Sequence, residues 1–524
     1  MSHPNIIVIV LDTLRGDRVI SNKGSKILTP NIKKILKNSI FFENCIANSP
    51  WTLPSHFNIF TGLYNAQLKL FNNKIDRIST KVPIITEIFK NIGYFTACYS
   101  ENPWINNVTG LSRGFNVHTK KNWKIHPKKI INEDKRVSFL LKIIYVIDKF
   151  SQRVIKINQI LKKWKIILRL SKHYIRSIAN LLLWKKTIFK IKINTKKEIN
   201  KFFKKIKNKL NRNPAFLFFN LMITHDPFIP TKKLLKKFGI TLKEIKLVET
   251  FLKYPNPSTI RVNLCSERLN SKQIKVIEKL YNSCVYYADQ IIQEIFSLLI
   301  KYNKLEDSYV IITSDHGEHL CGKLDHYLRG HHTFFSVYES LLKVPLIIFN
   351  NNLLNTRIKV QVQLKDLFHT LLNLVENEDF IKNYFELKKS LFYQIENESF
   401  PEYIFGEYLI TEKKVSKYIE RFKEDIKKKE ILQKLYSNTF FLRSNNYKYI
   451  TYDDQIEEFY NLNEDKNEQM NIINISSEKL QYFKKLMTNY QEDASDEKLI
   501  NHFIDKKEKS LIKNSIDRIN LKRI

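Results

Sequence analysis

The chain has 524 residues, and its 88 Lys and Arg residues outnumber its 52 Asp and Glu residues, which gives a formal net charge of +36. Hydrophobic residues make up 43% of the chain and aromatic residues 12%, enough for a large buried core, which excludes disordered, collagen-like and coiled-coil proteins. At roughly 150 residues per domain, the length allows two to four domains or one large α/β domain with additions. The charge makes nucleic acid, an anionic membrane surface or an acidic substrate the candidate partners.

Four runs of apolar and β-branched residues have the pattern of strands that are buried on both faces. They are Asn5–Leu11, Phe216–Ile223, Ser308–Thr313 and Val344–Phe349. Between them lie helical patterns such as Ser271–Asn303, in which apolar residues recur at spacings of three and four. This alternation predicts an α/β fold with a mixed, mostly parallel sheet that is flanked by helices. Polar clusters follow the first three runs, where ligands bind in such sheets.

The chain divides into a predicted catalytic domain, residues 1–375, and a smaller C-terminal α+β subdomain, residues 376–524. The subdomain is expected to contain a β-hairpin around Thr439–Tyr452 and to end in helices. Residues 120–212 interrupt the α/β pattern with 29 Lys and Arg against 4 Asp and Glu, a net charge of 29 − 4 = +25. This basic insertion is expected to form helices such as Phe139–Phe150 and Val154–Trp184.

Two interpretations of the insertion at residues 120–212 stay open. In the first, it contacts an anionic membrane surface peripherally, because it combines Lys and Arg with Leu, Ile and Trp. In the second, it forms a solvated helical lid over the ligand site expected at the ends of the strands. Nucleic acid is not an expected partner, because no DNA- or RNA-binding motif accompanies the charge. No uncharged run reaches about 18 residues, and Ile6–Leu11 is too short for a secretory signal. The sequence therefore predicts a cytoplasmic protein, and the membrane interpretation of the insertion adds a peripheral location at a membrane surface.

The five cysteines are scattered and lack C-x-x-C spacing, so we expect reduced thiols rather than a disulfide framework or a zinc site.

The segment Ser49–Gly62 predicts a short helix with a hydroxyl side chain at its N-terminus. Pro54 suits the first turn of a helix, and Gly62 suits the position after its end. Thr52 would then lie at the helix N-terminus, where backbone N–H groups and the helix dipole favour an anion. In the alternative interpretation, Thr52 or Ser55 is only an N-cap.

Oxygen and nitrogen ligands follow two of the predicted strands. Asp12 comes directly after the first strand, and Asp315 and His316 come after the third. Carboxylates with an imidazole suit a divalent cation such as Ca, Mn, Mg or Zn. A cation beside a hydroxyl lowers the pKa of that hydroxyl and makes it a nucleophile.

These motifs resemble those of the sulfatase family within the alkaline phosphatase superfamily. The family signature, Cys or Ser-x-Pro-Ser-Arg, four residues and Thr-Gly, reads here as Thr52-Leu-Pro-Ser-His56, four residues and Thr61-Gly62. Five further segments are similar in order and spacing: Asn5–Asp17, Leu221–Pro230, Ser314–Glu318, Gly330–Leu346, and Arg443 with Glu458–Asp465. The resemblance implies the sulfatase-like α/β fold with its C-terminal subdomain.

Residue by residue, the resemblance implies a metal ion held by Asp12, Asp315 and His316, with Thr52 completing the ligand shell as the nucleophile. It also implies that His225 and His331 bind the outer oxygens of the anion or protonate the leaving group. His331 and His332 stay alternatives, because that segment is slightly longer than the usual pattern. His56 and Arg15 are further candidates for substrate binding, but Arg15 equally suits a structural pair with Asp17.

The chain departs from the family pattern at three positions. Thr52 replaces the Cys or Ser that sulfatases convert to formylglycine, so no formylglycine is expected here. His56 replaces the accompanying Arg, and Thr13 replaces the second Asp of the usual Asp-Asp pair. Thr52 would therefore act as a plain alkoxide and form a covalent intermediate that water or another acceptor displaces at the central atom.

We expect a metal-dependent hydrolase of sulfate, phosphate or phosphonate esters. A sulfated or phosphorylated glycan or lipid is the candidate substrate. The first alternative is a phosphotransferase that moves a phospho-alcohol group onto a glycan or lipid. The second alternative is a non-catalytic binding protein, which the retention of every proposed ligand disfavours.

Overall fold

The computed structural model describes residues 3–19, 27–70, 76–120, 195–210, 213–228, 230–252, 269–322, 325–326, 336–375, 386–410, 430, 433–434, 437–453, 456–475 and 477–495. The predicted helices Phe139–Phe150 and Val154–Trp184 lie outside these residues, as do the candidate residues His331 and His332.

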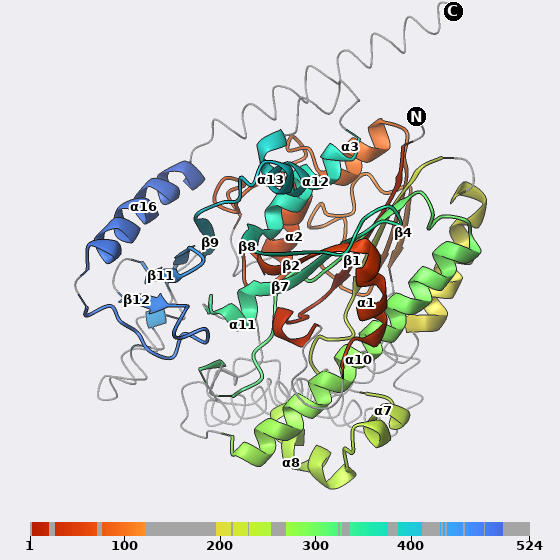
Figure 1. Cartoon of the computed structure of the whole chain (residues 1–524). Helices are drawn as coiled ribbons and strands as arrows, with labels where there is room; N and C mark the ends of the chain where they lie inside the picture. Colours follow the sequence, from red (N-terminus) through yellow and green to blue (C-terminus); the bar gives the residue numbers. More distant parts are fainter. Residues whose placement is uncertain are drawn as a thin grey trace, which may run out of the picture.

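The centre of the molecule is an eight-stranded sheet with the order β4-β3-β5-β1-β6-β7-β2-β8 (Figure 1). Its strands are β1 (Asn5–Leu11), β2 (Ser39–Ile46), β3 (Phe95–Ser100), β4 (Val117–Lys120), β5 (Ala215–Leu221), β6 (Ser308–Thr313), β7 (Lys343–Phe349) and β8 (Thr356–Gln363). All are parallel except β7, which runs antiparallel to β6 and β2. The predicted mixed, mostly parallel sheet is therefore confirmed.

Helices cover both faces of this sheet, which explains why its central strands are continuously apolar. Side chains of β1 alternate between two cores: Ile6, Val8 and Val10 pack with helices α2, α3 and α12, whereas Ile7, Ile9 and Leu11 pack with α1 and α10. The helices are α1 (Pro30–Ile35), α2 (Thr52–Thr61), α3 (Ile85–Asn91), α7 (Lys232–Lys237), α8 (Leu242–Leu252), α10 (Ser271–Lys301), α11 (Glu339–Leu342), α12 (Leu367–Asn373), α13 (Leu391–Glu396) and α16 (Glu478–Ser495), and residues 195–210 are also helical.

A second sheet follows the first, with four antiparallel strands in the order β12-β11-β10-β9. They are β9 (Ile404–Tyr408), β10 (Thr439–Arg443), β11 (Tyr447–Tyr452) and β12 (Ile456–Asn461), and α16 packs on them. The predicted hairpin forms the two central strands. Its Arg443 binds Glu339 of α11 through two hydrogen bonds of 2.9 and 3.0 Å, so a buried ion pair joins this sheet to the rest of the chain.

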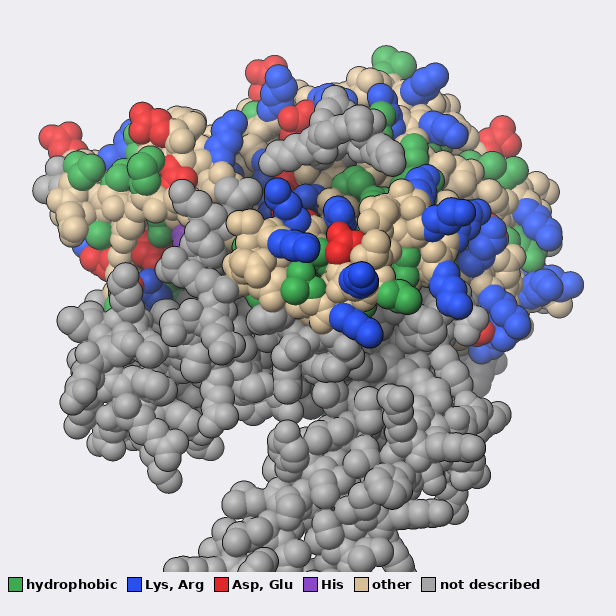
Figure 2. All heavy atoms as spheres, turned by 90° about the horizontal axis from the view of Figure 1, so that it is seen from below, with side chains coloured by type: hydrophobic (Ala, Val, Ile, Leu, Met, Phe, Trp, Pro, Cys, Tyr) green, Lys and Arg blue, Asp and Glu red, His purple; other side chains and the backbone are tan. Residues whose placement is uncertain are grey.

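The described part of the chain contains no helix that is both long and apolar enough to cross a membrane. Its four cysteines are buried, and none of them forms a disulfide: Cys45, Cys98, Cys284 and Cys321. Basic side chains are spread over the face that carries α7 and α8 (Figure 2). The exposed lysines of these two helices are Lys232, Lys233, Lys236, Lys237, Lys243 and Lys246.

Candidate active site

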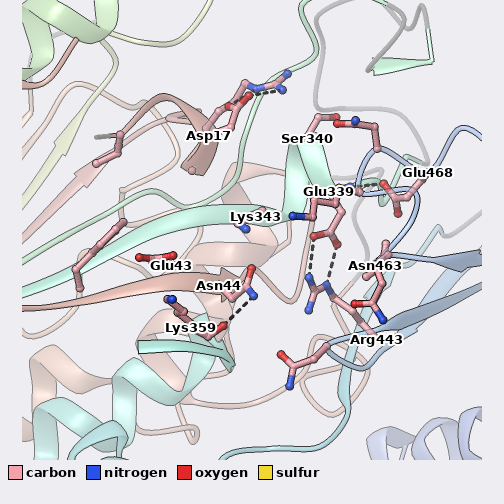
Figure 3. Close-up of a pocket in the computed structure, with 18 of the residues that line it drawn as sticks. Asp17, Glu43, Asn44, Glu339, Ser340, Lys343, Lys359, Arg443, Asn463 and Glu468 are labelled. Carbon is pink, nitrogen blue, oxygen red and sulfur yellow. Dashed lines mark hydrogen bonds and ion pairs between the residues drawn. The ribbon is translucent and has the colours of Figure 1, made fainter. Parts of the chain in front are cut away.

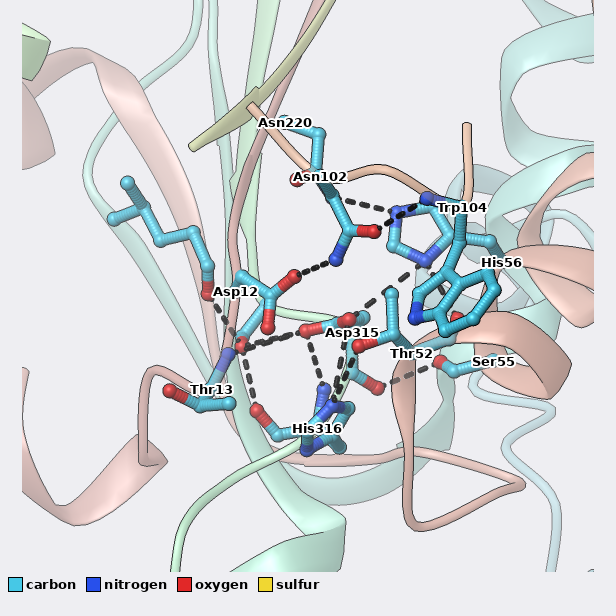
Figure 4. Close-up of polar contacts among 12 residues, drawn as sticks. Asp12, Thr13, Thr52, Ser55, His56, Asn102, Trp104, Asn220, Asp315 and His316 are labelled. Carbon is cyan, nitrogen blue, oxygen red and sulfur yellow. Dashed lines mark hydrogen bonds and ion pairs between the residues drawn. The ribbon is translucent and has the colours of Figure 1, made fainter. Parts of the chain in front are cut away.

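Strand pairing brings the predicted metal ligands together at one edge of the central sheet. Val10 of β1 pairs with Thr313 of β6, so both strands end at the same level and their following residues meet. The ligand atoms of Asp12, Asp315 and His316 lie within 4.8 Å of one another, and all three residues are fully buried (Figure 4). The structure thus assembles the cluster that the sequence motifs indicated.

The hydrogen bonds of Asp315 leave one oxygen for a cation. Its Oδ1 accepts from the backbone N–H groups of Thr13, at 3.2 Å, and of His316, at 3.0 Å. Its Oδ2 is buried and accepts no hydrogen bond within the described residues. Two imidazole nitrogens lie near Oδ2: His316 Nε2, at 3.5 Å, and His56 Nδ1, at 3.7 Å. An orphaned carboxylate oxygen beside a second carboxylate and an imidazole fits a divalent metal ion.

The ring of His316 is oriented so that Nε2 faces the cluster. Its Nδ1 lies 2.8 Å from the carbonyl oxygen of Gly317, which only accepts, so Nδ1 carries the proton. Burial lowers the pKa of His316 to about 4, against the opposing charge of Asp315. The ring is therefore neutral at pH 7, and the lone pair of Nε2 points toward the Thr52 hydroxyl, 3.3 Å away.

Asn102 supports Asp12, and sequence reasoning missed it. The Asn102 side-chain amide donates to Asp12 Oδ2 at 2.6 Å, and its carbonyl oxygen accepts from the Trp104 backbone N–H at 2.8 Å, which fixes the orientation of the amide (Figure 4). Thr224 also contributes, because its hydroxyl donates to the Asp12 carbonyl oxygen at 2.6 Å. Asn102 follows β3 by two residues, so the rule that ligands gather at strand ends could have identified it, but β3 was not among the predicted strands.

Helix α2 presents Thr52 to the metal cluster. The N-cap of α2 is Trp51, and Thr52 is the first helical residue, so the interpretation of Thr52 as an N-cap is wrong. Ser55 does not cap the helix either: its hydroxyl donates to the Asp315 carbonyl oxygen at 2.6 Å and ties α2 to the ligand loop. The helix ends at Gly62, whose φ of 70° lies in the left-handed region that favours glycine, as the sequence indicated.

Both ring nitrogens of His56, a predicted substrate-binding residue, contact other residues of the chain. It is fully buried, and its Nδ1 donates to the Thr52 carbonyl oxygen at 2.7 Å. Its Nε2 lies 2.9 Å from the side-chain amide of Asn220 on β5. Burial lowers the pKa of His56, so the neutral ring accepts from Asn220. The geometry makes His56 a support for the first turn of α2, and its contact with substrate stays a prediction.

His225 lies after β5, the neighbour of β1. Its Nδ1 donates to the Asp226 carbonyl oxygen at 2.6 Å and lies 3.1 Å from the Asp226 carboxylate. Burial disfavours a charge on the ring, but the hydrogen bond to Asp226 and the carboxylates of Asp12, Asp226 and Glu318 outweigh it and raise the pKa of His225 to about 9. The residue therefore combines a cationic imidazole with a place near the metal cluster.

Arg15 is held by carboxylates. Its guanidinium lies 2.9 Å from Asp17 and 2.6 Å from Asp325, and it also donates to the Glu318 carbonyl oxygen at 3.0 Å. The structural pair with Asp17, one of the two alternatives for Arg15, is present. Binding of substrate by Arg15 stays a prediction.

Thr13 occupies the position of the family's second Asp and has an unusual backbone. Its φ of 63° is rare for a β-branched residue. Three contacts hold the turn: Tyr281 donates to the Thr13 carbonyl oxygen at 2.7 Å, Arg15 N–H donates to the Tyr281 hydroxyl at 2.9 Å, and Leu14 N–H donates to the Ser314 hydroxyl at 2.8 Å. Nothing in the sequence near Tyr281 indicated that role.

Comparisons with known proteins agree with this fold. The family model described as Sulfatase matches residues 4–377. Arylsulfatase K of Canis lupus familiaris is 22% identical over 391 residues, which span 71% of this chain and 63% of the relative's length. The phosphonate monoester hydrolase of Agrobacterium radiobacter has a TM-score of 0.61 at 15% identity, covering 93% of this chain and 96% of the other. A protein solved with its substrate D-glucosamine-2-N,6-O-disulfate has a TM-score of 0.59 at 14% identity, covering 95% and 99%.

Proposed function

We propose, on the premise that this chain belongs to the sulfatase family, that it is a metal-dependent hydrolase of anionic esters with Thr52 as its nucleophile. Membership of the family makes the chain an ester hydrolase of the alkaline phosphatase superfamily. The observation that carries the finer proposal is the Thr52 hydroxyl, which lies at the N-terminus of α2 and 3.3 Å from Nε2 of His316.

Asp12, Asp315 and His316 would hold the metal ion, with the Thr52 oxygen as a further donor. When bound, a divalent cation lowers the pKa of an adjacent hydroxyl and stabilises negative charge on the ester oxygens. The donor set is compatible with Ca, Mn, Mg and Zn. Around this group the chain itself fixes the ligands: the Gly317 carbonyl orients His316, and Asn102 orients Asp12.

The reaction then follows from the placement of three groups. Thr52 Oγ1 loses its proton to solvent and attacks the sulfur or phosphorus atom, and the bond from that atom to the leaving oxygen breaks. The N-terminal N–H groups of α2 face the developing negative charge, and His225 donates a proton to the leaving oxygen. Water then attacks the same central atom and gives a proton to the His225 ring, the bond from that atom to Thr52 Oγ1 breaks, and Thr52 takes up a proton from solvent. His331 stays a second candidate for the proton donor.

Thr52 favours phosphorus esters over sulfate esters. A formylglycine hydrate can expel sulfate by breaking its own carbon–oxygen bond, but a threonine ester must be cleaved by attack on the central atom. Phosphate and phosphonate monoesters are therefore the favoured substrates, in line with the phosphonate monoester hydrolase among the structural neighbours. A sulfated sugar is the competing substrate class, since one neighbour was solved with such a compound.

The test is turnover by the purified full chain in the presence of Mn, Mg, Zn or Ca. Aryl esters of sulfate, phosphate, a phosphodiester and a phosphonate are compared for the unchanged chain, Thr52→Ala and the matched control Thr61→Ala at the other end of α2. We expect hydrolysis of the phosphorus esters that Thr52→Ala abolishes and Thr61→Ala retains. Equal turnover by Thr52→Ala would refute the nucleophile, and transfer to added glycerol in preference to water would favour the phosphotransferase.

A further inference from the structure

A polar cavity lies beside the metal-ligand loop, between the central sheet and the loop that follows β12. Its volume is about 640 Å³, and it contains none of the residues Asp12, Thr52, Asp315 and His316. The walls come from the turn after β1, the strands β2, β7 and β8, the start of α11, the end of β10 with the turn that follows it, and the segment 462–468 (Figure 3).

Each acidic residue that lines this cavity forms an ion pair with a cationic side chain. Asp17 lies 2.9 Å from Arg15, and Glu339 receives two hydrogen bonds from Arg443. Glu468 lies 2.7 Å from the amine of Lys448, a buried residue outside the cavity wall. The remaining acid is Glu43, which lies 3.5 Å from the guanidinium of Arg357.

Three lysines of the wall have no such match: Lys343, Lys359 and Lys466. Within the described residues, none of their amines forms an ion pair or a hydrogen bond. Lys343 is half-buried at the start of β7, and burial lowers the pKa of its amine against the opposing effect of Glu339. Glu339 and Glu43 partly offset the charge of Lys343, and Lys466 opposes it. Lysines that line one concave site repel one another, and a bound anion reduces that repulsion.

We propose that this cavity binds a dianionic oxyanion of the sulfate or phosphate class, held by Lys343, Lys359 and Lys466. Asn463 lines the same space with a side-chain amide, which supplies a neutral donor (Figure 3). The site is independent of the proposed nucleophile, because it uses other residues and binds an anion without reaction.

The cavity wall is also packed directly against the metal-ligand loop. Gly317 N–H, beside His316, donates to the Leu341 carbonyl oxygen at 2.7 Å, and a Cβ on Gly317 would lie 2.0 Å from the carbonyl oxygen of Ser340, a residue of the wall. A Cβ on Gly16 would lie 3.0 Å from the carbonyl oxygen of Lys343. An anion that orders β7 and α11 would therefore stabilise the loop that carries Asp315 and His316.

The test uses the full chain with Asp315→Asn, which removes the charge of a proposed metal ligand that does not line the cavity. Binding of inorganic sulfate and inorganic phosphate is measured by calorimetry and by the shift in melting temperature. We expect the double variant Lys359→Gln with Lys466→Gln to bind at least roughly tenfold more weakly, because two of three charges are lost. The matched control is Lys301→Gln with Lys388→Gln, two exposed lysines outside the cavity, and it should bind like the parent.

Anion binding by the variant Lys343→Gln is measured in the same way, and circular dichroism checks that this variant folds. Equal anion affinity in the parent and in the cavity variants would overturn the proposal, whatever the outcome of the turnover assays. A third arm adds D-glucosamine-2-N,6-O-disulfate. Tighter lysine-dependent binding of this sugar than of inorganic sulfate assigns the site to an anion carried on a larger molecule, and weaker binding assigns it to a free anion.

Discussion

The hydroxyl oxygen of Thr52 lies 3.3 Å from Nε2 of His316, although 264 positions separate the two residues in the chain. The contact joins the first residue of α2 to the loop that follows β6, so a helix N-terminus and a strand end form one site. Ser55, one turn further along α2, donates to the Asp315 carbonyl oxygen and fixes the same relationship from a second point.

If Thr52 is the nucleophile, its hydroxyl and not its shape is required. We expect Thr52→Val, which keeps the volume and the branch at Cβ, to lower kcat/KM by at least about 10³-fold. Thr52→Ser should keep measurable turnover, because it retains the oxygen. Kinetics on an aryl phosphate or phosphonate, with melting temperatures to show that both variants fold, check this. A Thr52→Val enzyme as active as Thr52→Ser would contradict it.

Asp315→Asn separates metal binding from the folding of the ligand loop. The Asn side-chain oxygen can still accept from the Thr13 and His316 N–H groups, but the charge at Oδ2 is lost. We expect bound metal, measured by elemental analysis after dialysis, to fall at least roughly tenfold, since a carboxylate ligand carries much of the attraction for a divalent cation. The same substitution at Asp453, an Asp outside the cluster, should leave the metal content unchanged. Retention of metal by Asp315→Asn would remove this residue from the ligand set.

The sequence predicted the metal cluster because its residues directly follow strands, where parallel topology brings them to one edge. It did not predict Asn102 or Tyr281, whose roles depend on the orientation of one amide and on how α10 lies across the turn at Thr13. His56 was interpreted as a substrate ligand because of its place in the signature. In the structure its ring is buried and forms hydrogen bonds with the Thr52 carbonyl oxygen and the Asn220 side-chain amide.

The fold was predictable where the apolar runs are long. The limits Asn5–Leu11 and Ser308–Thr313 agree with β1 and β6, and Ser271–Asn303 agrees with α10 to within its last turn. The direction of β7 was not predictable, because an apolar run buried on both faces looks the same in either direction. The C-terminal sheet is also wider than the predicted hairpin, since β9 pairs with β10 across a long stretch of chain.

Arg443 is expected to hold the C-terminal sheet against α11. Arg443→Ala would remove two hydrogen bonds to Glu339 and leave this carboxylate with Lys448 at 3.3 Å. Hydrogen bonds to charged groups contribute about 1.5–3 kcal/mol, so we expect a loss in that range. Urea unfolding should show this loss in the free energy of unfolding. The matched control is Arg357→Ala, which breaks the largely exposed pair with Glu43 and should cost less than about 1 kcal/mol. Equal losses in the two variants would contradict a special role for Arg443.

Glu407 of β9 should make stability depend on pH. The side chain is fully buried, and burial raises its pKa to about 7, against the hydrogen bonds that it accepts from the N–H groups of Ala66 and Asn65. The folded state therefore keeps a proton that the unfolded chain releases near its ordinary pKa of 4.5. The contribution of Glu407 to stability is fully present below pH 4.5 and is lost as the pH rises through 7.

Glu407→Gln cannot ionise, so it should remove this part of the pH dependence. The shift from 4.5 to about 7 corresponds to about 3 kcal/mol, so the variant should gain up to that amount relative to the unchanged chain between pH 4.5 and 8. Urea unfolding followed by tryptophan fluorescence across this range measures the difference. Glu396→Gln makes the same change at the exposed end of α13 and should reproduce the profile of the unchanged chain. A Glu407→Gln profile that runs parallel to both at every pH would show that Glu407 is ionised in the folded protein throughout this range.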